Sequence, residues 1–147
     1  MQSGIRTGWR HAVFALSLVA ILLVGALPVL AEECSRPGCW YDRLEDGKFI
    51  VSLASNPSTG YKWMVDYDQT HLTLVEENYQ AGGTDLIGAS GKTSFTFAAS
   101  NPGVSRMRFT YARSWELRQN ADNRDFAVQS EVREGQVVLR IAEVGSG

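Results

Sequence analysis

The stretch RMRFTY, residues 106–111, alternates polar and apolar side chains without a break. In an extended strand, successive side chains point to opposite faces of the sheet. Met107, Phe109 and Tyr111 would therefore share one face, and two arginines and a threonine would share the other. This pattern predicts a half-buried antiparallel strand with one face toward a core and the other toward solvent.

The same period of two recurs on both sides of this strand. The apolar members of the other alternating sets are Phe49, Val51 and Leu53; Tyr61, Trp63 and Val65; Phe95 and Phe97; and Val137, Leu139 and Ile141. Residues 72–75 and 126–132 are weaker strand candidates, turns are expected at 101–103 and 134–135, and the polar stretch 118–124 is expected to be an exposed loop. About seven or eight short antiparallel strands predict an all-β, immunoglobulin-like β-sandwich, with a small barrel as the alternative.

The first 31 residues have the order of a secretory signal peptide. Arg6 and Arg10 form a basic start, residues 12–27 are an almost unbroken apolar run, and residues 29–31, Val-Leu-Ala, fit a cleavage site. The alternative is an uncleaved membrane anchor, because the apolar run is nearly long enough to span a bilayer. Cleavage would leave a protein that is secreted or periplasmic and has no membrane attachment.

Removal of this leader would leave one domain's length of chain, long enough for a core. The expected organisation is a signal peptide at 1–31, an N-terminal segment at 32–46 and the sandwich domain at 47–147. Two of the 14 Lys and Arg residues fall in the leader but none of the 16 Asp and Glu residues does, so the mature chain has a net charge of −4. No basic patch stands out, which argues against nucleic acid as a partner.

The two cysteines, Cys34 and Cys39, lie close together at the start of the mature chain. In an oxidising compartment they would pair, closing a loop too small to give much entropic stabilisation. A metal site is the alternative, but no further Cys or His lies nearby in the sequence to complete a set of ligands. We therefore expect a disulfide that fixes the N-terminal segment, and neither a metal nor another cofactor.

The sequence contains no recognisable catalytic motif. Of its two histidines, His11 lies in the leader, and no motif surrounds His71. There is no nucleophile elbow, no HExxH metal motif and no phosphate-binding loop. We therefore do not expect an enzyme. A small periplasmic enzyme that uses paired carboxylates is a further alternative.

Three segments fit neither a plain strand nor a plain turn: NPSTGYKW at 56–63, LIGASGKTSFTF at 86–97 and YARSWE at 111–116. Their order and spacing resemble the chagasin family of cysteine-peptidase inhibitors, over residues 47–143. That family carries an Asn-Pro-Thr-Thr-Gly-aromatic loop, a Gly-x-Gly-Gly loop and an Arg-Pro-Trp or Arg-Pro-Phe loop. The resemblance implies an immunoglobulin-like fold whose three loops enter the active-site cleft of papain-like peptidases.

Carried over by position, the resemblance assigns the residues of the three inhibitory loops. The first loop is Asn56, Pro57, Ser58, Thr59, Gly60 and Tyr61; the second is Gly88, Ala89, Ser90 and Gly91; the third is Arg113, Ser114 and Trp115. The first would face the catalytic cysteine and histidine, and the others would lie along the sides of the cleft. Such a protein would be a monomeric, reversible, tight-binding inhibitor that forms no covalent bond.

The sequence departs from the family pattern at three positions. Ser58 keeps the hydroxyl of the threonine that it replaces, Ser90 adds a side chain where the family has glycine, and Ser114 replaces a proline that would restrain the third loop. These departures bear on target range and affinity. Taken alone, residues 56–61 are a simple turn, and Trp115 would be a core residue if its strand ran straight on. The alternative function is therefore a secreted immunoglobulin-like binding module for another protein or a surface ligand.

Overall fold

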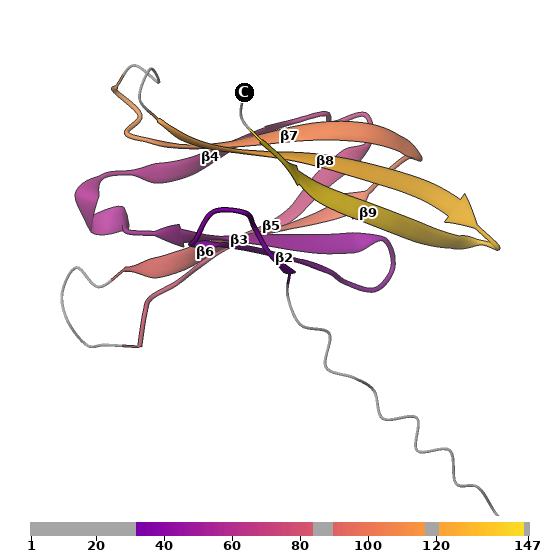
Figure 1. Cartoon of the computed structure of the whole chain (residues 1–147), viewed down its shortest axis with the longest axis horizontal. Coiled ribbons are helices and arrows are strands. Elements are labelled where there is room, and N and C mark those ends of the chain that lie inside the picture. The colour runs from indigo at the N-terminus through magenta and orange to yellow at the C-terminus, as the bar shows by residue number, and fades with distance from the viewer. Residues whose placement is uncertain (1–31, 84–89, 117–120, 146–147) are drawn as a thin grey trace, which may run out of the picture.

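The computed structural model describes residues 32–83, 90–116 and 121–145. Within these residues, two antiparallel β-sheets lie face to face (Figure 1). The strand order is β1-β2-β3-β6-β5 in the first sheet and β4-β7-β8-β9 in the second. The all-β sandwich that the alternating sequence predicts is confirmed, and the described strands form two separate sheets and not a small closed barrel.

The strands have the following bounds. The first sheet contains β1 (Glu32–Glu33), β2 (Cys39–Arg43), β3 (Lys48–Ser55), β6 (Gly91–Ala99) and β5 (Leu72–Gln80). The second contains β4 (Lys62–Tyr67), β7 (Gly103–Ala112), β8 (Asp122–Arg133) and β9 (Gln136–Val144). A short 3-10 helix, η1 (Pro57–Thr59), connects β3 to β4 across the two sheets.

The core is made by the apolar faces that the alternation predicts. Strand β7 buries Met107 and Phe109, and the ring centroid of Phe109 lies 5.2 Å from that of Phe95 and 5.8 Å from that of Phe126. Phe95 belongs to the first sheet and Phe126 to the second, so Phe109 joins aromatic side chains of both sheets. Val137 departs from its pattern and is partly exposed, because it lies beside the turn that ends the β8–β9 hairpin.

Two parts of the chain differ from the sequence prediction. The N-terminal segment 32–46 contributes β1 and β2 to the first sheet, so the sandwich begins before residue 47. The predicted exposed loop at 118–124 is wrong in its last part: β8 begins at Asp122, and Arg124 is buried. Its guanidinium is paired with the largely buried carboxylate of Glu143 and the partly exposed carboxylate of Asp122, which polar composition alone does not reveal. Residues 118–120 lie outside the described residues.

Cys34 and Cys39 form a disulfide in the structure, with their Cα atoms 5.3 Å apart. Cys39 is buried in the core at the start of β2, opposite Leu53 of β3. The intervening residues 35–38 form a loop that contacts the second sheet, since Ser35 donates hydrogen bonds to the carboxylate of Glu143. The disulfide therefore closes a loop that reaches from one sheet to the other.

In the described part of the chain, no helix is long and apolar enough to cross a membrane. The predicted signal peptide, residues 1–31, lies outside the described residues. Its cleavage and the cellular location of the protein stay predictions.

Candidate functional site

The strand ends that flank the three predicted loops gather at one end of the sandwich (Figure 1). Ser55, the last residue of β3, pairs with Gly91, the first residue of β6. Lys62, the first residue of β4, pairs with Ala112, the last residue of β7. Antiparallel pairing therefore places one flank of the first loop beside the second loop and the other flank beside the third.

The first loop is a single helical turn whose shape is set by its own residues. Pro57 begins η1, and Gly60 ends it with a φ of 80°, a left-handed conformation that favours glycine. The hydroxyl of Ser58 donates to Asn56 Oδ1 at 2.5 Å, and that of Thr59 donates to the Asn56 carbonyl at 2.7 Å. Pro57, Ser58 and Thr59 are exposed, so the tip projects as a pre-shaped turn.

An aromatic cluster supports the base of the first loop. The Asn56 N–H donates to the Tyr111 hydroxyl at 2.8 Å. The Tyr111 ring centroid lies 5.3 Å from that of Tyr61 and 4.8 Å from that of Trp63. Trp63 is buried and its indole N–H donates to the Ala54 carbonyl at 2.9 Å. The base of the first loop therefore packs against side chains of the core and of β7.

The third loop leaves the sheet where β7 ends, at Ala112. The next four residues form a turn in which the Glu116 N–H donates to the Arg113 carbonyl at 3.1 Å. Because of this turn, Trp115 does not continue the strand into the core, and 73% of the residue is exposed. An indole so exposed at the loop end of the molecule is available to a partner protein.

The first and third loops touch each other. A Cβ atom at position 60 would lie only 3.2 Å from Cη2 of the Trp115 indole. Because Gly60 has no side chain, the indole can pack against the first loop. The Arg113 Nε–H donates to the Thr59 carbonyl at 3.0 Å, and the guanidinium carbon lies 4.7 Å from the centroid of the Tyr61 ring. Together the two loops form one continuous surface.

The second loop is described only at its end. Gly88 and Ala89 lie outside the described residues, Ser90 is exposed, and Gly91 begins β6. A side chain at Gly91 would collide with the backbone carbonyl of Gln80, at the end of β5. The glycine at this position is thus explained by the close approach of β5 and β6.

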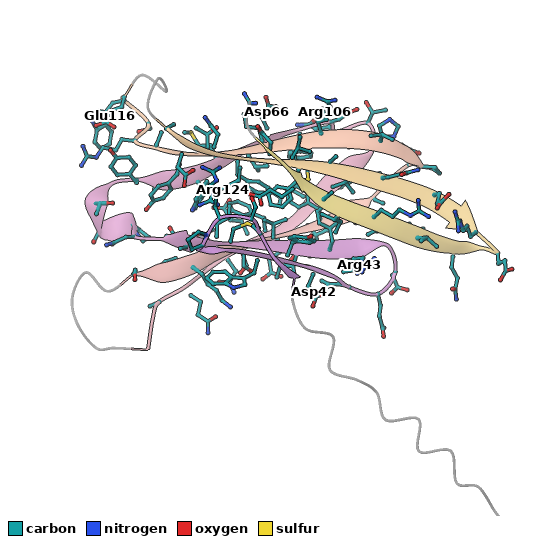
Figure 2. All side chains as sticks on the ribbon, in the orientation of Figure 1. Asp42, Arg43, Asp66, Arg106, Glu116 and Arg124 are labelled. Carbon is teal, nitrogen blue, oxygen red and sulfur yellow. A yellow bond between two sulfur atoms is a disulfide. The ribbon has the colours of Figure 1, made fainter. Side chains whose placement is uncertain are left out.

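Sequence reasoning missed two residues that hold the loops. Tyr111 was placed on the core face of its strand and at the start of the third segment, and no contact with the first loop was predicted for it, although its hydroxyl binds the first residue of that loop. Glu116, which Figure 2 places at the loop end, was assigned no role, although its carboxylate pairs with Arg113 at 2.8 Å. The available sequence signal was the spacing of Arg113 and Glu116, two opposite charges that lie three residues apart.

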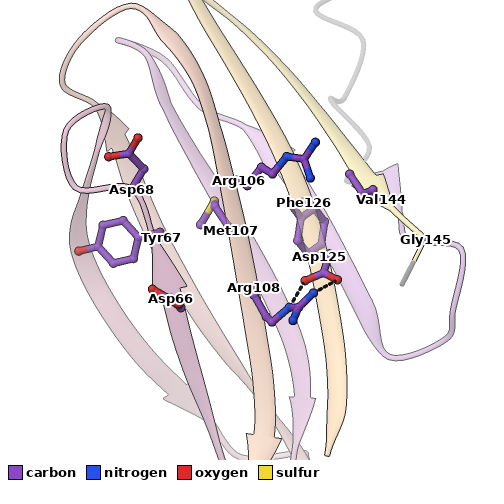
Figure 3. Close-up of a pocket in the computed structure, with 10 residues that line it drawn as sticks. All are labelled: Asp66, Tyr67, Asp68, Arg106, Met107, Arg108, Asp125, Phe126, Val144 and Gly145. Atoms are coloured by element: carbon purple, nitrogen blue, oxygen red, sulfur yellow. Dashed lines mark hydrogen bonds and ion pairs between the residues drawn. The ribbon is translucent and has the colours of Figure 1, made fainter. Parts of the chain in front are cut away.

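A groove of about 600 Å³ lies beside β4, β7 and β8, and Figure 3 shows the residues that line it. Its charged side chains are Asp66, Asp68, Arg106, Arg108 and Asp125. Arg108 and Asp125 form a two-pronged pair at 2.7 and 3.0 Å, and this hydrogen bonding raises the pKa of Arg108. Hydrogen bonds from Thr70 keep the pKa of Asp68 below its usual range. The described residues that line the groove include no Cys, Ser, Lys or His, and its carboxylates are those of Asp66, Asp68 and Asp125.

One family model and two known proteins match this chain. The model of the family described as "Chagasin family peptidase inhibitor I42" matches residues 45–129, a range that contains all three loop segments. Amoebiasin-1 of Entamoeba histolytica is 28% identical over 83 residues, which cover 56% of this chain and 79% of that protein. The crystal structure of the cysteine protease inhibitor EhICP2, also from Entamoeba histolytica, aligns with a TM-score of 0.43 at 25% identity. That alignment covers 46% of this chain and 62%, less than two thirds, of the other.

Proposed function

Because this chain belongs to the chagasin family of peptidase inhibitors, we propose that it inhibits papain-like cysteine peptidases by filling their active-site cleft. Members of this family are inhibitors and not enzymes, so the expectation that the chain is not an enzyme is confirmed. In the proposed complex, the tip of the first loop lies at the centre of the cleft, and the second and third loops lie on its two sides. Binding is reversible and tight, and the inhibitor acts as a monomer.

The observation that carries this proposal is the joint surface of the first and third loops. The tip at Pro57–Thr59 is exposed and closed by its own hydrogen bonds, and Trp115 stands exposed beside it. A pre-shaped surface loses little conformational entropy on binding. An exposed tryptophan is among the side chains that contribute most at protein interfaces. Because the tip backbone is helical, it presents no extended peptide bond for attack.

A titration of active-site-counted papain and of a cathepsin L-type peptidase tests the proposal directly. Residues 32–147 should inhibit competitively, reversibly and with one inhibitor bound per active site, and gel filtration should show a monomer. Recovery of full peptidase activity on dilution would show that inhibition is reversible. No inhibition of either enzyme at about micromolar concentration, which corresponds to about −8 kcal/mol of binding, would contradict the proposal. The chain would then be examined as a binding module for another protein.

We also propose that the protein is exported and that its signal peptide is removed after Ala31. The basic start and apolar run of the leader support export, as does the Cys34–Cys39 disulfide, since such bonds persist in oxidising compartments. Intact-mass measurement of the protein recovered outside the cytoplasm should give a chain that begins at Glu32. A mass that begins at Met1 would instead support a retained anchor.

A further inference from the structure

We infer that Arg113 is a positioning residue, held by Glu116, that fixes the first loop against the third, and not a residue that binds the peptidase. This inference rests on the proposed function, because it assigns the two residues a role in shaping the inhibitory surface. It also separates Arg113 from its neighbour Trp115, which is far more exposed. The residue pair Arg113–Glu116 is called the loop strut below.

The guanidinium of Arg113 is engaged on three sides. Its Nε–H donates to the Thr59 carbonyl at 3.0 Å, and Nη1 pairs with Oε1 of Glu116 at 2.8 Å. Its carbon lies 4.7 Å from the centroid of the Tyr61 ring, within the range of a cation–π contact. Arginine has a planar group that can make all three contacts at once, whereas lysine has a single point charge. The side chain is therefore held in one position, between the loops.

Within its described residues, the third loop lacks the proline that the family pattern places at position 114. Ser114 is exposed and has no ring to fix its backbone. The turn itself is closed by the backbone hydrogen bond from Glu116 to Arg113, at 3.1 Å. The side chains of the same two residues add a second closure across this turn. The loop strut thus supplies restraint that a proline at position 114 would otherwise give.

The effect of the strut should appear in binding more than in stability. An exposed ion pair by itself contributes little to the free energy of folding. Here the pair also orients the donor that reaches Thr59, and so couples the position of Trp115 to that of the first loop. Loops that are free to move relative to each other must be ordered on binding, and this ordering costs affinity.

The inference is tested with Glu116→Gln, Arg113→Lys and the double variant, each in protein expressed from the full chain and purified in its processed form. Glu116→Gln should raise the inhibition constant for papain about 3- to 10-fold, and Arg113→Lys should raise it at least as much. The double variant should inhibit no more weakly than Arg113→Lys alone, because both changes break one network.

In the free wild-type protein, the Arg113 Nε–H should give a resolved, slowly exchanging signal in a ¹H–¹⁵N spectrum. Glu116→Gln should speed its exchange while the unfolding temperature stays the same.

The matched control is Glu131→Gln, which removes the charge from another ion pair, between half-buried Glu131 and exposed Arg133, whose atoms also lie 2.8 Å apart. This control should leave the inhibition constant and the Arg113 signal unchanged. Wild-type inhibition by Glu116→Gln with an unchanged Nε–H signal would overturn the inference, as would losses that add in the double variant. If the wild-type protein inhibits no peptidase, the proposed function fails, whereas the exchange measurement on the free protein still tests the strut.

Discussion

Replacement of Trp115 by alanine should weaken binding to the target peptidase by about 1–4 kcal/mol while the unfolding temperature stays the same. The residue is 73% exposed, beyond the end of β7, so its removal leaves no cavity in the core. Its indole lies against Gly60, at the foot of the exposed first loop, and would supply a large apolar surface to the wall of the cleft. Inhibition constants and thermal unfolding, measured on the same preparations, check the two halves of this prediction.

Val104→Ala is the matched control for this change. Val104 is also an exposed apolar residue, at 63%, and it lies at the start of the same strand, β7, away from the loop end. Its replacement should leave inhibition unchanged. A drop in the unfolding temperature of Trp115→Ala without a matching loss of affinity would assign Trp115 to the core instead. Equal losses for Trp115→Ala and Val104→Ala would show that the loop end is not the contact surface.

The fold could be predicted because its signal is local and repeated. In the RMRFTY stretch, neighbouring side chains differ sharply in polarity, so the core face of β7 follows from strand geometry alone. The short β1 and β2 were missed, because Cys39–Arg43 has no clear alternation and is held mainly by pairing with β3. Pairing between distant segments is a tertiary effect that local sequence does not encode.

The candidate site was predictable as three segments but not as a set of contacts. The loop positions followed from the resemblance, whereas the restraint of the third loop by Arg113 depends on side-chain directions across 54 residues of chain. The loss of proline at position 114 indicated a looser loop. The structure instead closes the turn through Glu116, whose sequence spacing alone does not distinguish a strut from a solvated charge.

Arg124 is the clearest case in which polar composition was misleading, and it has a structural role. Arg124 lies between the two sheets (Figure 2), and its side chain is 8% exposed. It donates to the carbonyls of Arg36 and Pro37 at 3.3 and 3.2 Å. These carbonyls belong to the loop closed by the Cys34–Cys39 disulfide. The guanidinium also lies 3.2 Å from Asp122 and 3.9 Å from Glu143. It therefore fastens the N-terminal loop to the second sheet.

Arg124→Ala should lower the free energy of unfolding by about 3–5 kcal/mol. The change leaves the carboxylate of Glu143, 9% exposed, without its cation, and it removes the donors of two loop carbonyls. Arg140→Ala, at an exposed position on the neighbouring strand β9, should change stability by no more than about 0.5 kcal/mol. Urea denaturation followed by tryptophan fluorescence measures both variants.

Arg124→Ala combined with Glu143→Gln should recover part of the loss, because no unpaired charge then stays buried at position 143. A loss below about 1 kcal/mol in the single variant would show that solvent replaces the guanidinium and that Arg124 does not fasten the loop.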